Sequence, residues 1–233
     1  MNKRIVITAG ICIACFCLLL MSYKFYLRRF YLPWKTLNSD YWNTQNEYFG
    51  KMKNIENSIL FIGNSLTENF DLFQLNNSQI INIGIRGDYT TGVLQRIPII
   101  SHHNPKKIFI EIGINDILAD ISPDQIKQNY NEIISIIESN SPSTKIYIQS
   151  ILPVNFENGF FANCQKANIQ INEINSCLKT LCLKKNHDYI DLHTNFKING
   201  KLNPLLTIDG VHLNKDGYSL WAKTIYPYVN DSN

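Results

Sequence analysis

Five short apolar runs recur along the chain, and each is continuous instead of alternating between apolar and polar residues. Branched aliphatic residues, mainly isoleucine, dominate them. This pattern is typical of strands that are buried on both faces of a sheet. The runs cover residues 58–63, 79–84, 107–113, 145–150 and 188–192.

Helical periodicity occupies several of the intervals between these runs. Ser122 is a predicted N-cap, Pro123 the first helical residue and Gln125 the third, a capping-box pattern followed by apolar residues at helical spacing. Further helices are predicted over residues 165–185 and 214–226, the second with its opening asparagine as N-cap. Alternating strands and helices predict an α/β fold with a parallel sheet and helices on both faces.

An uncharged apolar segment runs from Ile5 to Tyr23, ahead of a flank rich in aromatic and basic residues. A bilayer requires about 20 apolar residues, and such a flank suits the headgroup layer. We therefore predict an uncleaved, single-pass membrane anchor. A cleaved signal peptide is the alternative, although "MSYKFYL" is a poor cleavage site. A lipoprotein at Cys15 is a weaker alternative, since a cysteine stands three residues before it.

The basic residues on the two sides of this segment are nearly balanced, so the positive-inside rule leaves the orientation open. We expect the folded domain on the extracytoplasmic side. The predicted division is residues 1–35 as anchor and flank, 36–57 as linker or N-terminal helix, and 58–230 as the folded domain.

Composition and charge limit the size of the fold and the kinds of partner that the chain is expected to bind. The 233 residues are 45% hydrophobic and 18% charged, which is enough for one globular domain and a short appendage. The net charge of +3 includes no basic stripe, so we predict no nucleic-acid partner. Of six cysteines, three lie in the apolar segment and the other three lack metal-ligand spacing. We therefore expect no disulfide framework and no metal.

Polar or small residues follow three strands at the edge where ligands bind in parallel sheets. Ser65 follows the first strand, Gly84 the second and Asn115 the third. Each alone could be an ordinary turn residue, and Ser65 alone could be a helix cap. Three such strand ends together favour a functional site with Ser65 as nucleophile.

A serine nucleophile needs a base. His102, His103 and His187 precede strands, which places them at the opposite edge. His193 follows the fifth strand, two residues after Asp191, and is a candidate. His212 is favoured, because Asp209 three residues earlier could fold back onto its imidazole and fix the tautomer.

Four sequence blocks together resemble the SGNH hydrolases, also called GDSL esterases or lipases. They are "GNSLT" with Ser65, "NIGIRGDYTTGVLQRI" with Gly84, "GIND" with Asn115 and "DGVHLNKDGY" with Asp209 and His212. The resemblance extends from about residue 59 to 229 and is strongest to the branch related to platelet-activating-factor acetylhydrolase. It implies a three-layer α/β/α sandwich with a five-stranded flavodoxin-like sheet, so that residues 58–230 would form an SGNH hydrolase domain.

The resemblance also implies a mechanism. Ser65, His212 and Asp209 would form the catalytic triad, and the oxyanion hole would consist of the Ser65 and Gly84 backbone N–H groups with the Asn115 amide. No cofactor is implied. One departure is Asn64, which stands where the family usually has Asp before the serine. Gly87 is interpreted as turn geometry, with Asp88 bracing the nucleophile loop.

The family hydrolyses many acyl esters, and the resembled branch implies short acyl chains. We expect an esterase acting on a small-molecule or glycan ester, with acetylated carbohydrate favoured. One alternative is a lysophospholipase or lipase at the membrane. Another is an inactive glycan-binding protein on the same fold, with Asn64 as its indication.

Overall fold

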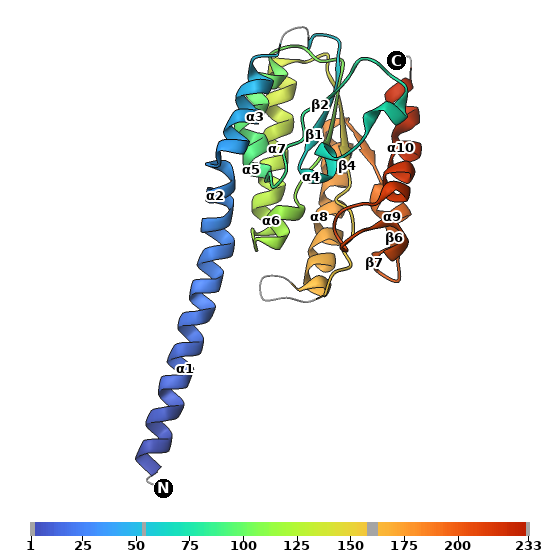
Figure 1. The fold of residues 1–233 in the computed structure, drawn as a ribbon. Helices are drawn as coiled ribbons and strands as arrows, with labels where there is room; N and C mark the ends of the chain where they lie inside the picture. Colours follow the sequence, from blue (N-terminus) through green and yellow to red (C-terminus); the bar gives the residue numbers. More distant parts are fainter. Residues whose placement is uncertain (1–2, 53–54, 158–162, 232–233) are drawn as a thin grey trace.

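The computed structural model describes residues 3–52, 55–157 and 163–231, with side chains from residue 11 onward. Its centre is a five-stranded sheet in the order β2-β1-β3-β4-β5, with every neighbouring pair parallel (Figure 1). This is the predicted flavodoxin-like order. The strands are β1 (Ile59–Gly63), β2 (Ile80–Asn82), β3 (Lys107–Glu111), β4 (Lys145–Gln149) and β5 (Asp188–Ile190).

Burial within the sheet follows strand position. Every residue of β1 and β3 is buried, as their continuous apolar runs predict. Strand β2 is only half-buried, because it lies at the edge of the sheet with a neighbour on one side. The prediction of burial on both faces is therefore wrong for β2 and also for β5, the other edge strand, of which only Ile190 is buried.

Helices cover both faces of the sheet. Helix α5 (Thr90–Ser101) packs against α7 (Pro123–Asn140), and α7 packs against α8 (Cys164–Lys185). On the other side of the sheet, α10 (Lys215–Asn230) packs against the short helix η2 (Leu72–Leu75) (Figure 1). Both predicted N-caps are confirmed, since the Ser122 and Asn214 side chains accept backbone N–H bonds from the first turns of α7 and α10.

An aromatic layer joins α10 to the sheet. Phe61, Phe109 and Tyr147 lie opposite one another on β1, β3 and β4, and their rings stack with centroids 4.7 and 4.5 Å apart. Trp221 of α10 donates its indole N–H to Gln149 at 2.7 Å. The buried tryptophan thus satisfies its polar group while contributing apolar area to the core.

The N-terminal region forms a helical rod that leaves the domain at one end (Figure 1). It consists of α1 (Lys3–Tyr26), a π-helical segment η1 (Leu27–Tyr31) and α2 (Leu32–Leu37). Within it, residues 11–37 are long and apolar enough to cross a membrane by length and composition. The helix thus extends beyond the predicted apolar run of residues 5–23.

Helix α3 (Asp40–Gly50) turns from this rod onto the domain. Trp42 and Phe49 of α3 are buried in the core, and the Trp42 indole N–H bonds the Asp88 carboxylate at 2.9 Å. Residues 36–57, expected to form a linker or a helix, thus include a helix that packs with the folded domain.

Short elements follow the carboxyl ends of the strands and build the edge where the site lies. Helix α4 follows β1, α6 follows β3, and α9 follows β5, after which the hairpin β6–β7 and the short helix η3 lead to the loop before α10. Their bounds are α4 (Ser65–Glu68), α6 (Ile114–Leu118), α9 (Leu192–Phe196), β6 (Lys197–Ile198), β7 (Lys201–Leu202) and η3 (Pro204–Leu206).

Candidate active site

Ser65 is the first residue of α4, directly after the turn that ends β1. The turn is tight, because a side chain at Gly63 would collide with the Glu111 carbonyl and with Thr67. Asn64 caps the helix through its side-chain oxygen, which accepts the Leu66 N–H at 2.9 Å. An asparagine thus supplies the acceptor that this turn requires, and Ser65 is held at the carboxyl end of the sheet.

A chain of hydrogen bonds links Ser65 to an imidazole and a carboxylate. The Ser65 Oγ lies 3.0 Å from His212 Nε2, and His212 Nδ1 lies 2.7 Å from Asp209 Oδ2. A carboxylate only accepts hydrogen bonds, so Nδ1 carries the proton and Nε2 is free to accept from the serine hydroxyl. This arrangement can remove a proton from Ser65 as its oxygen attacks an electrophile.

The loop between η3 and α10 holds Asp209 in place. Its Oδ1 accepts the backbone N–H groups of Val211 and His212 at 2.9 and 2.7 Å. Partial burial acts to raise the pKa of Asp209, but the His212 ring and these backbone bonds outweigh it and lower that pKa. Asp209 is therefore ionised at neutral pH and can stabilise a protonated His212.

Asn115 and Gly87 share a cavity with Ser65 and His212. Asn115 lies in the first turn of α6 and donates one amide hydrogen to the Asp88 carbonyl at 2.8 Å, which leaves the other available. Gly87 adopts φ +75°, a conformation that favours glycine. The cavity has a volume of about 410 Å³ and is lined by Ser65, Asn69, Arg86, Gly87, Asn115 and His212.

Gly84, the predicted second-block donor, lies outside this cavity. Its backbone N–H donates to Asn82 Oδ1 at 2.9 Å and is therefore occupied. A side chain at this position would collide with the backbone of Asn64 and Glu68, so this glycine permits α4 to pack against the second-block loop. Among the residues that the structure describes, the Gly87 N–H has no hydrogen-bond partner. Gly87, and not the predicted Gly84, therefore lines the cavity with Ser65.

His193 is not brought to Ser65. It is buried in α9, its Nε2 has no hydrogen-bond partner among the described residues, and burial lowers its pKa to about 4. Asp191 caps α9 and bonds Thr194 instead of His193. The fifth strand, predicted over residues 188–192, ends at Ile190, and residues 192–196 form a helix.

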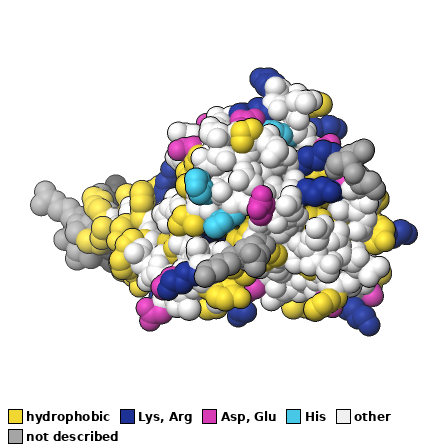
Figure 2. All heavy atoms as spheres, turned by 90° about the horizontal axis from the view of Figure 1, so that it is seen from above, with side chains coloured by type: hydrophobic (Ala, Val, Ile, Leu, Met, Phe, Trp, Pro, Cys, Tyr) yellow, Lys and Arg dark blue, Asp and Glu magenta, His cyan; other side chains and the backbone are white. Residues whose placement is uncertain are grey.

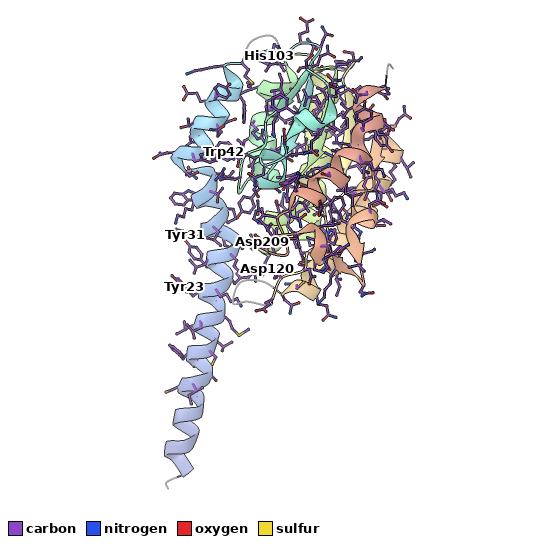
Figure 3. The ribbon with its side chains drawn as sticks, turned by 45° about the vertical axis from the view of Figure 1, so that its right-hand side comes forward. Tyr23, Tyr31, Trp42, His103, Asp120 and Asp209 are labelled. Carbon is purple, nitrogen blue, oxygen red and sulfur yellow. The ribbon has the colours of Figure 1, made fainter. Side chains whose placement is uncertain are left out.

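Other histidines lie away from the site. His103 is at the end of the domain opposite Asp209 (Figure 3). Figure 2 looks onto that opposite end and shows histidine side chains gathered there. Within the described residues, no group of three or more His, Cys, Asp or Glu could hold a metal ion.

A buried ion pair supports the loop that carries Gly87. Asp88 pairs with Arg96 of α5 at 3.0 Å, and both side chains are fully buried. Arg96 also donates to the carbonyls of Ile83 and Gly63, at 2.8 and 3.3 Å. Arg96 thereby connects the Asp88 loop to the turn before Ser65. A bracing role for Asp88 was predicted from the sequence, but a role for Arg96, eight residues later, was not.

Glu111, at the end of β3, is fully buried, and neither carboxylate oxygen has a hydrogen-bond partner among the described residues. Burial raises its pKa to about 8. The folded protein therefore keeps this proton to higher pH than the unfolded chain, in which a glutamate titrates near ~4.3. Its contribution to the free energy of unfolding is full below about pH 4 and falls as pH rises to about 8.

Between pH 4.5 and 8 the wild type should lose on the order of 3–5 kcal/mol of its free energy of unfolding as Glu111 becomes harder to keep protonated. The Glu111→Gln variant cannot ionise at this position, so we expect it not to show that loss. The measurement is chemical unfolding across that range, and the relevant quantity is the difference in pH slope from the wild type. Glu132→Gln, on the exposed surface of α7, is the control and should leave the slope unchanged. Equal slopes for wild type and Glu111→Gln would show that Glu111 is ionised in the folded protein.

Comparison with known proteins places this geometry in a family. Residues 61–220 match the GDSL-like Lipase/Acylhydrolase family. A structure from Streptococcus pneumonia, provisionally named as a platelet activating factor, superposes with a TM-score of 0.70 and 25% identity, covering 92% of this chain and 99% of that one.

Two curated relatives are each 27% identical. Thioesterase 1/protease 1/lysophospholipase L1 of Escherichia coli K12 aligns over 66% of this chain and 70% of its own length. N-acylneuraminate cytidylyltransferase of Escherichia coli O18:K1:H7 aligns over 73% of this chain but only 40% of its own length, so the chain spans well under half of that relative. The family match covers more than half of the sequence, from the middle of β1 into α10, and the chain belongs to the GDSL-like lipase/acylhydrolase family.

Proposed function

We propose that this protein is a serine esterase that hydrolyses short-chain acyl esters, with Ser65, His212 and Asp209 as its catalytic triad. The observation that most directly supports this proposal is the hydrogen-bond chain from Ser65 Oγ through His212 to Asp209, at 3.0 and 2.7 Å. His212 takes the hydroxyl proton as Ser65 attacks the ester carbonyl, then gives it to the leaving alcohol. Water, activated by the same imidazole, releases the acid from the acyl-serine.

The oxyanion of each tetrahedral intermediate would be bound by the backbone N–H groups of Ser65 and Gly87 and by the Asn115 side-chain amide. Gly87 and Asn115 line the same cavity as Ser65, and the Gly87 N–H has no other acceptor among the described residues. Asn115 is positioned by its bond to the Asp88 carbonyl, so its remaining hydrogen is held in place before charge develops. Such preorganised donors stabilise the transition state more than the substrate.

Asn115→Ala is expected to reduce kcat by about 10²–10³-fold, or roughly 3–4 kcal/mol of transition-state stabilisation, with little change in KM. Steady-state kinetics with a soluble acetate ester measures both constants. Asn69→Ala removes another asparagine that lines the cavity but has no oxyanion role in this proposal, so any effect of that variant is expected in KM and not in kcat. A change confined to KM would make Asn115 a substrate-binding residue.

The proposed substrate is an acetyl or similarly short ester, carried by a carbohydrate. The cavity around Ser65 is lined mainly by polar side chains, with Arg86 and Asn69 beside the nucleophile. Such a lining suits a hydroxylated alcohol better than a long acyl chain. The relative named for N-acylneuraminate, a sugar acid, adds support for carbohydrate.

A lysophospholipase activity is the second candidate, since one relative carries that name. An acyl chain-length series from p-nitrophenyl acetate to p-nitrophenyl palmitate tests the choice. We expect kcat/KM to be highest at two to four carbons and to fall steeply beyond. Highest activity at long chains would favour the lipase, and no turnover of any ester would favour an inactive binding protein.

We further propose that the N-terminal rod anchors the protein in a membrane, with the folded domain on the extracytoplasmic side. The support is the apolar helix near the N-terminus, whose side chains from residue 11 to 22 are exposed in the structure. Exposed apolar side chains on a helix of this length are costly in water and favourable in a bilayer.

A further inference from the structure

The N-terminal rod is fastened to the same edge of the domain that carries the candidate site. Arg28 forms an ion pair with Asp120 at 2.9 Å and donates to the Leu118 carbonyl at 2.6 Å. Arg29 donates to the Asp120 carbonyl at 3.0 Å. Leu118 is the last residue of α6, the helix whose first turn carries Asn115.

The rod therefore determines which way the site faces. It leaves the domain at the end where the strands have their carboxyl termini (Figure 1). Asp209 and Asp120 lie at that end, near the level of Tyr31 on the rod, whereas His103 lies at the far end (Figure 3). If α1 crosses a bilayer, the catalytic edge faces the lipid.

Helix geometry gives the height of this edge above the hydrocarbon. The uncharged run ends at Tyr23, and Arg28 follows about 7 Å further along the helix, at ~1.5 Å per residue. Asp209 of the site lies near the level of Tyr31 (Figure 3), eight residues beyond Tyr23 along the rod, which is about 12 Å at that rise. The site thus lies on the order of 10–15 Å from the hydrocarbon, whereas the headgroup layer is only about 5–8 Å deep on each side.

The segment from β6 to the Asp209 loop has a surface suited to an anionic bilayer. Its apolar side chains Ile198, Leu205 and Ile208 are exposed by 48%, 76% and 72%. Lys197 and Lys201 are exposed on the β6–β7 hairpin beside them. Apolar residues interspersed with lysines are typical of surfaces that rest in the interfacial layer.

We propose that the catalytic edge lies on the membrane that holds α1, and that the enzyme removes short acyl groups from the polar headgroups of amphiphiles in that membrane. This rests on the proposed esterase function and on the proposed anchor. An ester bond between a lipid tail and its backbone lies at the hydrocarbon boundary, below the reach of Ser65. An ester on a sugar headgroup extends upward to the height of the site.

The test uses the full chain reconstituted in liposomes and a seven-residue helical insertion, EAAAKAA, between Tyr23 and Lys24. Seven residues are about two helical turns, so the insertion raises the domain by about 10 Å with little rotation. The same insertion directly before Lys3 lengthens the chain without raising the domain and is the matched control. Two probes are compared: p-nitrophenyl acetate, which is soluble, and a diacylglycerol glucoside O-acetylated on the glucose, within the same liposomes.

We expect the insertion after Tyr23 to reduce acetate release from the glycolipid at least tenfold and to leave p-nitrophenyl acetate hydrolysis unchanged, while the control insertion alters neither rate. An unchanged glycolipid rate in the raised variant would overturn the proposal. The wild-type protein should also deacetylate glycolipid in its own liposomes faster than glycolipid in separate liposomes, and equal rates would overturn the proposal. Faster release of fatty acids from the lipid tails than of acetate would overturn it as well. If the wild-type protein does not hydrolyse p-nitrophenyl acetate at all, the esterase function itself is refuted.

Discussion

Ser65→Ala is expected to reduce kcat by at least ~10⁴-fold, because removal of one member disables a triad as a unit. Alanine removes the Ser65 Oγ, which hydrogen-bonds His212, and keeps the Cβ. The nucleophile is therefore lost while the fold stays in place. Steady-state kinetics with p-nitrophenyl acetate measures the loss. The temperature of unfolding should remain that of the wild type.

Covalent labelling gives an independent measure of the same assignment. A fluorophosphonate probe should label the wild type and should not label Ser65→Ala. Ser139→Ala, an exposed serine on α7, should retain both labelling and activity. Labelling that persists in Ser65→Ala would show that another residue is the nucleophile.

His212→Ala is expected to abolish turnover in a protein that remains folded. The His212 side chain is 37% exposed, so its loss removes little core packing, but it holds the hydrogen bonds to both Ser65 and Asp209. Asp209→Asn should be intermediate or severe, since an amide can stabilise the wrong imidazole tautomer. The pairing of a severe kinetic defect with a wild-type unfolding temperature would mark His212 as catalytic.

His193→Ala is the comparison variant for the base. Because His193 is buried in α9, its loss is expected to lower stability by leaving a cavity. The kcat of the folded fraction should nevertheless stay within about tenfold of the wild type, no more than ~1.4 kcal/mol. An inactive, folded His193→Ala together with an active His212→Ala would overturn the triad and make Asp191 the carboxylate to test.

The sequence predicted the sheet well because its signal is local. Continuous isoleucine-rich runs are expected only where both faces of a strand are covered, and β1 and β3 satisfy this completely. The caps at Ser122 and Asn214 are equally local, since each bond joins residues three apart. Strand β2 departed from the pattern because edge position depends on the order of strands, which a single run does not contain.

The site was only partly predictable. Ser65, Asn115, Asp209 and His212 could be placed by strand ends and by the Asp-x-x-His spacing. Gly84 was predicted as the oxyanion donor and Gly87 as turn geometry, because residue type alone does not separate two glycines in the loop after β2. What separates them is a hydrogen-bond partner and a position: Asn82 occupies the Gly84 N–H, whereas Gly87 lines the cavity. Arg96 was missed because its role depends on contacts with Asp88 and the Gly63 carbonyl across the fold.

By itself, the sequence determined the α/β alternation, the apolar N-terminal helix and the candidate site residues Ser65, Asp209 and His212. Each of these depends on residue type and on spacing within one element. The tertiary structure alone decided that Gly87, and not Gly84, lines the cavity with Ser65, how α3 packs with the domain, and that the site shares an edge with the N-terminal rod. These features depend on contacts such as Arg28 with Asp120, 92 residues apart along the chain, and no local pattern encodes a partner at that separation.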